Sequence, residues 1–200
     1  MTMTRGWGLT GALALWIAAV SLGLAAQADF SVESVQAVIR FTARTSFALF
    51  CLAFSAAALY RLRPNAWTRW QRRNRRYLGV AFAASHFIHA LAIVAFARLD
   101  PVQFHAGTGI GMYVLGGLAY VFIVLMSATS FDATAAWLGP RAWRLLHLTG
   151  SYYISISFLT GFGKRIPLNP LYALPVAVLL AIYVLRGASW VAARSPARTA

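Results

Sequence analysis

Four histidines are the residues of this chain most able to do chemistry, and three of them lie in long apolar stretches. His86 and His89 stand three positions apart, so on a helix their side chains are about 60° apart and can face one neighbour. His147 lies in a separate apolar stretch, and His105 lies between two such stretches. Imidazoles that project inward from facing helices bind metals and hemes. We therefore take His86, His89 and His147 as candidate metal ligands, with heme iron as the metal.

The chemistry expected of such histidines is ligation of a b-type heme, whose iron takes a neutral imidazole on each side. A heme needs a flat apolar slot, and nearby aromatic side chains could form its walls: Phe82, Phe87, Tyr152, Tyr153 and Phe158. The alternative interpretation is that the histidines hydrogen-bond Ser or Thr between helices and hold no cofactor. Ionisable residues at membrane depth are costly and are functional hypotheses by default, so both interpretations stand.

The elements that carry these histidines are predicted to lie in a lipid bilayer. Hydrophobic residues make up 60% of the 200 residues and charged residues 11%, and the mean hydropathy is +0.66. Soluble domains carry about 25% charged residues, so this chain could not cover a water-facing surface. The formal charge of +14 does not indicate nucleic-acid binding, because the arginines cluster between apolar runs, as in membrane proteins. With Cys51 as the single cysteine, no intrachain disulfide is expected.

Six stretches are long and apolar enough for transmembrane helices, which need about 20 residues each. They cover residues 7–26, 41–60, 78–97, 109–128, 142–162 and 171–185. The predicted fold is an all-α six-transmembrane-helix bundle. The glycines of the fourth stretch (Gly109, Gly111, Gly116 and Gly117) predict a helix that a neighbour can approach closely. No acidic residue lies within a span, which argues against a proton-coupled transporter.

The distribution of basic residues predicts the orientation. Residues 61–76 hold seven arginines, and placing this loop inside puts thirteen of the eighteen basic residues on that side. Both termini are then cytoplasmic, and the protein is a multi-pass protein of the bacterial inner membrane. The basic loop would attract anionic lipid or dock an acidic soluble reductase. Arg5, an apolar run and Ala26-Gln-Ala28 also resemble a cleavable signal peptide, which would leave five spans in the same orientation.

Three short motifs carry a resemblance to a known family. Arg75-Arg-Tyr-Leu-Gly followed by His89 resembles the "RR-x-LG…H" helix of the ferric-reductase-like transmembrane superfamily, and Trp143-Arg-Leu-Leu-His147 resembles its "W-x-x-L-H" motif. Arg44-Thr45 is similar to its "G-R-T" motif, with Ala43 in place of the glycine. Within the superfamily, the chain looks like the MsrQ/YedZ family, the heme-binding membrane subunit of a methionine-sulfoxide reductase system. The resemblance spans roughly residues 44–185.

The resemblance implies a transmembrane electron-transfer subunit of an oxidoreductase rather than a complete enzyme. It implies heme b, an electron donor that is a quinol or a flavin reductase, and a periplasmic reductase as acceptor; FMN or a quinone is a further implied cofactor. His89 and His147 would be heme ligands. Arg44 would pair with a heme propionate, or would serve as an interfacial anchor. Residues 1–40 would form the first transmembrane helix and outer loop, 41–188 the ferric-reductase-like domain, and 189–200 a basic cytoplasmic tail.

One departure from the family pattern changes the expected ligand set. Family members carry a second histidine thirteen residues after the first on the fifth helix, and here that position is Thr160. Thirteen helical residues span about 20 Å, so the missing ligand belongs to a second level of the membrane. Three arrangements follow: His86 or His89 pairs with His147, His89 pairs with His105, or heme binding is weakened or lost. One heme is expected rather than two, and the alternative function is a heme-free membrane scaffold or assembly protein.

Overall fold

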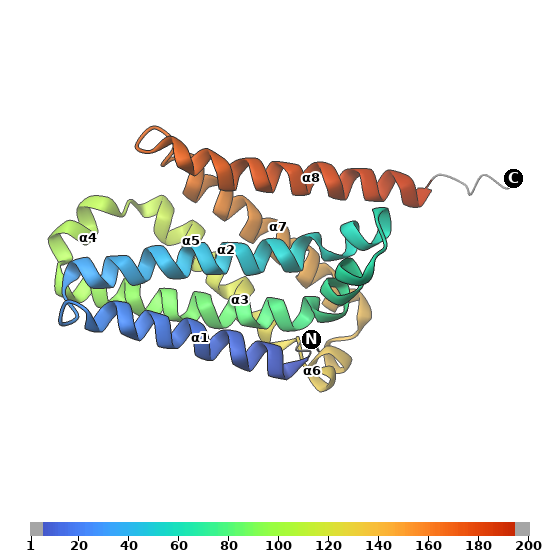
Figure 1. Cartoon of the computed structure of the whole chain (residues 1–200), viewed down its shortest axis with the longest axis horizontal. Helices are drawn as coiled ribbons and strands as arrows, with labels where there is room; N and C mark the ends of the chain where they lie inside the picture. The colour runs from blue at the N-terminus through green and yellow to red at the C-terminus, as the bar shows by residue number, and fades with distance from the viewer. Residues whose placement is uncertain (1–5, 195–200) are drawn as a thin grey trace, which may run out of the picture.

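A computed structural model describes residues 6–194 of the chain, and every regular element in that part is helical. Figure 1 shows the helices in a bundle. In chain order they are α1 (Trp7–Ala26), α2 (Val32–Leu62), α3 (Ala66–Leu99), α4 (Pro101–Gly107), α5 (Ile110–Ala128), α6 (Asp132–Leu138), α7 (Pro140–Gly163), the 3-10 turn η1 (Pro170–Tyr172) and α8 (Ala173–Arg194).

The all-α prediction is confirmed, and five helices are long and apolar enough to cross a membrane: α1, α2, α3, α5 and the η1–α8 segment. Several helices able to cross a membrane are typical of a multi-pass membrane protein. Helix α7 covers the predicted stretch 142–162, but it lacks an 18-residue stretch as apolar as those of the other five. It nevertheless runs from the end of the bundle that carries α6 to the end where α8 begins (Figure 1).

The basic segment 61–76 differs from the loop that the sequence predicted. Only Arg63 to Asn65 lie outside helices, and the remaining residues continue α2 or begin α3. The reason is a capping box, in which the Asn65 side chain accepts the N–H of Thr68 (2.9 Å) and the Thr68 hydroxyl accepts the N–H of Asn65 (3.0 Å). Arginine is also a good helix former, so its charge does not interrupt α3.

Helices α2 and α8 extend past the expected region boundaries. Helix α2 begins at Val32, where the Ser31 side chain accepts the N–H of Ser34, and α8 continues to Arg194. The expected boundaries at residues 40 and 188 therefore fall inside continuous helices. At 1.5 Å per residue, α2 and α3 are longer than the hydrocarbon core of about 30 Å, so their ends reach beyond it.

An α2–α3 hairpin forms the centre of the bundle. Helix α1 packs on both of its helices, α8 packs on α2, and α5 pairs with α7. Helix α7 reaches the hairpin through aromatic rings: Phe158 lies 5.5 Å from Phe50 and 6.3 Å from Phe82 between ring centroids. The starts of α1 and α3, helix α6 and the end of α8 gather at one end of the bundle, which we call the basic end (Figure 1).

The close helix contact involves a glycine other than those predicted. A Cβ added at Gly109, Gly111, Gly116 or Gly117 would meet nothing within 4 Å. On α7, by contrast, a Cβ added at Gly150 would collide with the Met126 sulfur and lie 3.0 Å from the Phe122 ring, both on α5. The α5–α7 approach therefore depends on a glycine of α7, because the glycines of α5 face away from their neighbours within the chain.

Candidate functional site

His86 and His89 lie side by side on α3, as their spacing predicted. Their ring centroids are 5.1 Å apart and their planes differ by 28°. Both side chains are largely enclosed by α2, α3 and α5, and we call them the histidine pair. The Nδ1 atom of His86 is buried and has no hydrogen-bond partner in the described part of the chain. A buried polar atom without a partner is costly in a low-dielectric interior, so His86 is a candidate for a function beyond packing.

A hydrogen bond to α2 fixes the orientation of His89. The Thr42 hydroxyl lies 2.9 Å from His89 Nδ1 and 2.7 Å from the Val38 carbonyl oxygen. A hydroxyl has one proton, and the carbonyl can only accept it. When Thr42 donates to the Val38 carbonyl, it accepts from His89 Nδ1–H. This assignment leaves the lone pair of His89 on Nε2, which is the form of imidazole that binds a metal.

Buried hydroxyl groups continue this contact along the α2–α3 interface. The Ser46 hydroxyl donates to Ser85 (2.9 Å), Ser85 lies 3.0 Å from the Thr45 hydroxyl, and Thr42, Ser46 and Ser85 are fully buried. Hydrogen bonds of Ser and Thr commonly join transmembrane helices. The hydroxyl groups thus lock α2 against α3 and hold Thr42 opposite His89.

Two of the five expected wall residues, Phe82 and Phe158, lie at the histidine pair, and Tyr152, which is 36% exposed, does not. Phe82 and Phe158 lie 5.4 and 6.1 Å from His86 between ring centroids, and Tyr152 packs against Phe54 further along. The expectation fails for Phe87, which is 63% exposed because it points away from the hairpin. Tyr153 also faces elsewhere, and its hydroxyl donates to the Leu115 carbonyl of α5.

Tyr120 of α5 completes the surroundings of the histidine pair. Its ring lies 5.0 Å from the His86 ring, and its hydroxyl donates to the His86 carbonyl oxygen at 3.3 Å. This contact ties α5 to α3 at the level of the pair. The pair therefore lies in an aromatic environment that contains Phe82, Phe158 and Tyr120.

His147 lies in a different place, at the end of α5. Its Nε2 atom is 3.0 Å from the Thr129 hydroxyl, and its ring stacks on Trp143 with 4.2 Å between centroids. When Thr129 donates its hydroxyl proton to the Leu125 carbonyl (2.7 Å), it accepts from His147 Nε2–H. The metal-binding lone pair of His147 is then on Nδ1, the opposite assignment to that of His89.

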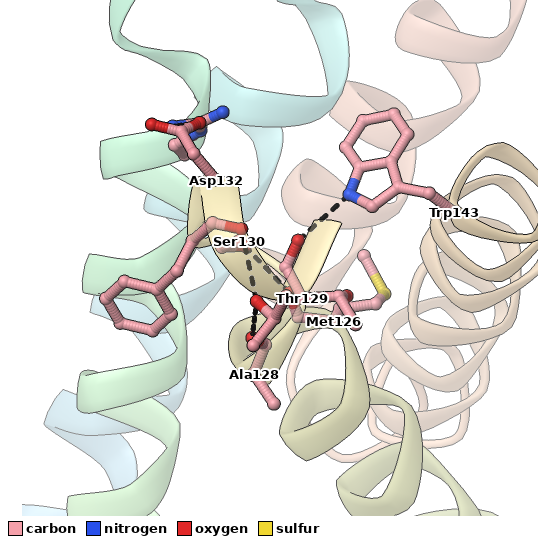
Figure 2. Close-up of polar contacts among 9 residues, drawn as sticks. Met126, Ala128, Thr129, Ser130, Asp132 and Trp143 are labelled. Carbon is pink, nitrogen blue, oxygen red and sulfur yellow. Dashed lines mark hydrogen bonds and ion pairs between the residues drawn. The ribbon is translucent and has the colours of Figure 1, made fainter. Parts of the chain in front are cut away.

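Figure 2 shows the turn that holds Thr129 in position. The Trp143 indole N–H donates to the Thr129 carbonyl (2.9 Å), and the Ser130 hydroxyl donates to the Met126 carbonyl (2.7 Å). The last carbonyl groups of a helix have no partner within it, and these side chains satisfy them. His147 and Trp143 together therefore anchor α7 to the end of α5.

The structure does not bring His147 to the histidine pair. His86 contacts Tyr120 and His147 contacts Thr129, nine residues further along α5. Nine helical residues correspond to about 14 Å along the axis. Within residues 6–194, no three His, Cys, Asp or Glu side chains form a group able to hold a metal ion. This arrangement does not place His147 across one iron from His86 or His89.

The remaining candidates lie apart from the pair. His105 is exposed on α4, which replaces the expected outer loop, and its contacts are Tyr113 (3.4 Å) and Phe104. Arg44 is exposed on α2, directly before the most apolar part of that helix. Thr160 is also exposed and donates to the Ser157 carbonyl of its own helix. The level of α7 that faces the pair is therefore occupied by Phe158 rather than by a ligand.

Sequence reasoning missed Thr42, Tyr120 and Thr129, which contact the histidines. One signal was available: Thr42 and Ser46 on α2, and Ser85 and His89 on α3, each stand four positions apart and so form polar stripes within apolar helices. These residues could supply one axial ligand to a heme iron. With Nδ1 bonded to Thr42, His89 has a lone pair on Nε2, and the unpartnered Nδ1 of His86 lies beside it. They do not supply an opposing imidazole from α7.

Comparisons with protein-family models, with curated proteins and with solved structures found no match to this chain. The resemblance to the ferric-reductase-like superfamily therefore stays a prediction from the three motifs.

Proposed function

We propose that the chain is a transmembrane electron-transfer subunit that holds one b-type heme at His89. The observation that carries this proposal is the Thr42–His89 hydrogen bond, which leaves the Nε2 lone pair of a buried imidazole free. In metal sites, a hydrogen bond to the ring nitrogen that does not bind the metal fixes the tautomer and orientation of the histidine. The unpartnered Nδ1 of His86 beside it adds support, because an apolar core does not retain such an atom without a reason.

Each residue then has a definite part. His89 would bind the iron, Thr42 would keep its ring in the binding orientation, and Tyr120 with Phe82 would exclude water. Arg44, which is exposed on α2 two residues after Thr42, would pair with a propionate or anchor that helix at the interface. When bound, the heme would supply an iron that takes up and releases one electron, and the chain would tune its potential through burial and ligation.

The same proposal includes six crossing helices, with both termini cytoplasmic in a bacterial inner membrane. The gathering of basic segments at one end of the bundle supports this orientation (Figure 1). Helix α7 would be the sixth span. The motif resemblance supports a quinol or flavin reductase as donor, FMN or a quinone as an additional cofactor, and a periplasmic methionine-sulfoxide reductase-like protein as acceptor.

The second candidate is a heme-free membrane scaffold or assembly protein of the same fold. Two observations favour it: Phe158 packs against His86 where a second ligand would approach, and His147 bonds Thr129 away from the histidine pair. In that case the histidines act as interhelical hydrogen-bonding residues, as sequence analysis also allowed.

The absorption spectrum of the purified protein, expressed with ample heme, separates the two candidates. We expect a Soret band that shifts on reduction with dithionite, is lost in His89→Ala and persists in His147→Ala. His105→Ala is a matched control, because His105 is an exposed histidine outside the pair. A wild-type protein without a Soret band supports the scaffold. A band that depends on His147 but not on His89 overturns the assignment of the site.

A further inference from the structure

A basic pocket lies at the basic end of the bundle, far along α3 from the histidine pair. It has a volume of about 580 Å³ and is lined by Tyr60 at the end of α2 and by Arg69, Arg72 and Arg73 near the start of α3. It is an open hollow with a polar lining rather than an enclosed cavity, and it is large enough for a lipid headgroup. The three arginines stand at positions i, i+3 and i+4, so they project from one face of α3.

The pocket carries uncompensated positive charge. Within residues 6–194 the only ion pair joins Arg76 to Asp132, so the three arginines of the pocket have no carboxylate partner there. Like charges at this spacing destabilise a helix. The Arg72 guanidinium lies 4.6 Å from the centre of the Tyr60 ring, a contact that holds it at the pocket. The arrangement favours an anion that guanidinium groups can bind through two parallel hydrogen bonds, namely a phosphate.

The level of the pocket indicates where that phosphate comes from. Trp67 and Trp70, on the same part of α3 as the pocket arginines, stack on each other with 5.0 Å between centroids, and Trp67 is 48% exposed. Trp190 of α8, at the same end of the bundle, is 54% exposed and stacks under Arg194. Exposed tryptophans at the ends of apolar helices mark the headgroup level of a bilayer. A phosphate at this level belongs to a lipid.

We propose that Tyr60, Arg69, Arg72 and Arg73 form a specific site for the phosphodiester headgroup of an anionic phospholipid. Because three guanidinium groups converge there, a lipid with two phosphates, such as cardiolipin, binds more tightly than phosphatidylglycerol. Basic pockets on the cytoplasmic side of transmembrane helices bind such headgroups. The site is independent of heme binding, so it holds whether the chain is an electron-transfer subunit or a scaffold.

Native mass spectrometry of the full-length protein in detergent tests the proposal, with cardiolipin, phosphatidylglycerol and phosphatidylcholine as probes. We expect one tightly held cardiolipin and none of phosphatidylcholine. Each arginine near a membrane surface contributes about fivefold to the binding of anionic lipid. The triple variant Arg69→Gln, Arg72→Gln, Arg73→Gln should therefore weaken cardiolipin binding about a hundredfold.

A second triple variant, Arg141→Gln, Arg144→Gln, Arg194→Gln, is the matched control, because it removes the same charge from the basic end outside the pocket. We expect it to weaken binding much less than the pocket triple variant, because its three arginines do not line the pocket. Tyr60→Leu changes no charge and should weaken binding about two- to fivefold by removing the ring under Arg72. It also tests the site if the pocket triple variant fails to fold, which circular dichroism would reveal.

Three outcomes would overturn the proposal. Equal losses in the two triple variants would mean that only bulk charge attracts lipid. Full displacement of cardiolipin by millimolar inorganic pyrophosphate would mean that the site takes soluble phosphates. Cardiolipin binding that is unchanged both in Tyr60→Leu and in the pocket triple variant would mean that the lipid binds elsewhere.

Discussion

The hydrogen bond between Thr42 and His89 can be tested by replacing Thr42 with valine. Valine has nearly the shape of threonine but no hydroxyl, so Thr42→Val removes the acceptor of His89 Nδ1–H without opening a cavity. Thr42 is fully buried, and water does not replace the lost partner. The Val38 carbonyl keeps its helical hydrogen bond, so the orphaned His89 N–H is the main consequence.

The magnitude follows from measurements on similar contacts. A buried donor without a partner costs about 1–3 kcal/mol, and hydrogen bonds between transmembrane helices average about 0.6 kcal/mol with a maximum near 1.7. We therefore expect Thr42→Val to lower the free energy of unfolding by about 1 kcal/mol. If heme is bound, losing the Thr42 hydroxyl that bonds His89 should also weaken heme binding about 10–100-fold.

The assay is a double-mutant cycle with Thr42→Val and His89→Leu. Unfolding is followed by tryptophan fluorescence in dodecylmaltoside micelles titrated with sodium dodecyl sulfate. In the His89→Leu background Thr42→Val should cost less, because no imidazole is left unpaired, giving a coupling energy of about 0.6–1.7 kcal/mol. Thr42→Ser, which keeps the hydroxyl, should retain the coupling. Additive effects within about 0.3 kcal/mol would refute the reasoning.

Two further predictions concern packing and charge. Gly150→Val should lower the free energy of unfolding by about 1–3 kcal/mol, because its Cβ collides with Met126; Gly117→Val, whose Cβ meets nothing, should not show this loss, and equal losses in the same unfolding assay would contradict the packing described. Asp132→Asn should cost about 0.2–1 kcal/mol, because its 2.7 Å ion pair with Arg76 is exposed. That cost should disappear in about 1 M salt, where the Debye length is about 3 Å; a cost that salt does not change would mean the pair is not screened.

Several features followed from the sequence alone because they depend on local composition. The bounds predicted for the first span, residues 7–26, are those of α1, since an apolar run of about 20 residues matches the membrane thickness. The pairing of His86 with His89 also followed, because helical spacing fixes the angle between their side chains. The sequence determined less about the basic segment, since arginine content indicates topology but does not prevent helix formation, and the capping box extended α3 through it.

The tertiary structure alone decided which nitrogen of each histidine makes a hydrogen bond. His89 and His147 both lie in apolar helices, yet Thr42 bonds Nδ1 of His89 and Thr129 bonds Nε2 of His147. Sequence spacing cannot predict such contacts, because they depend on how α2 meets α3 and how α5 meets α7. The same holds for Gly150, whose importance comes from the position of Met126 across the interface. Local periodicity thus set which helices form and which residues share a face, and interhelical packing set which atoms meet.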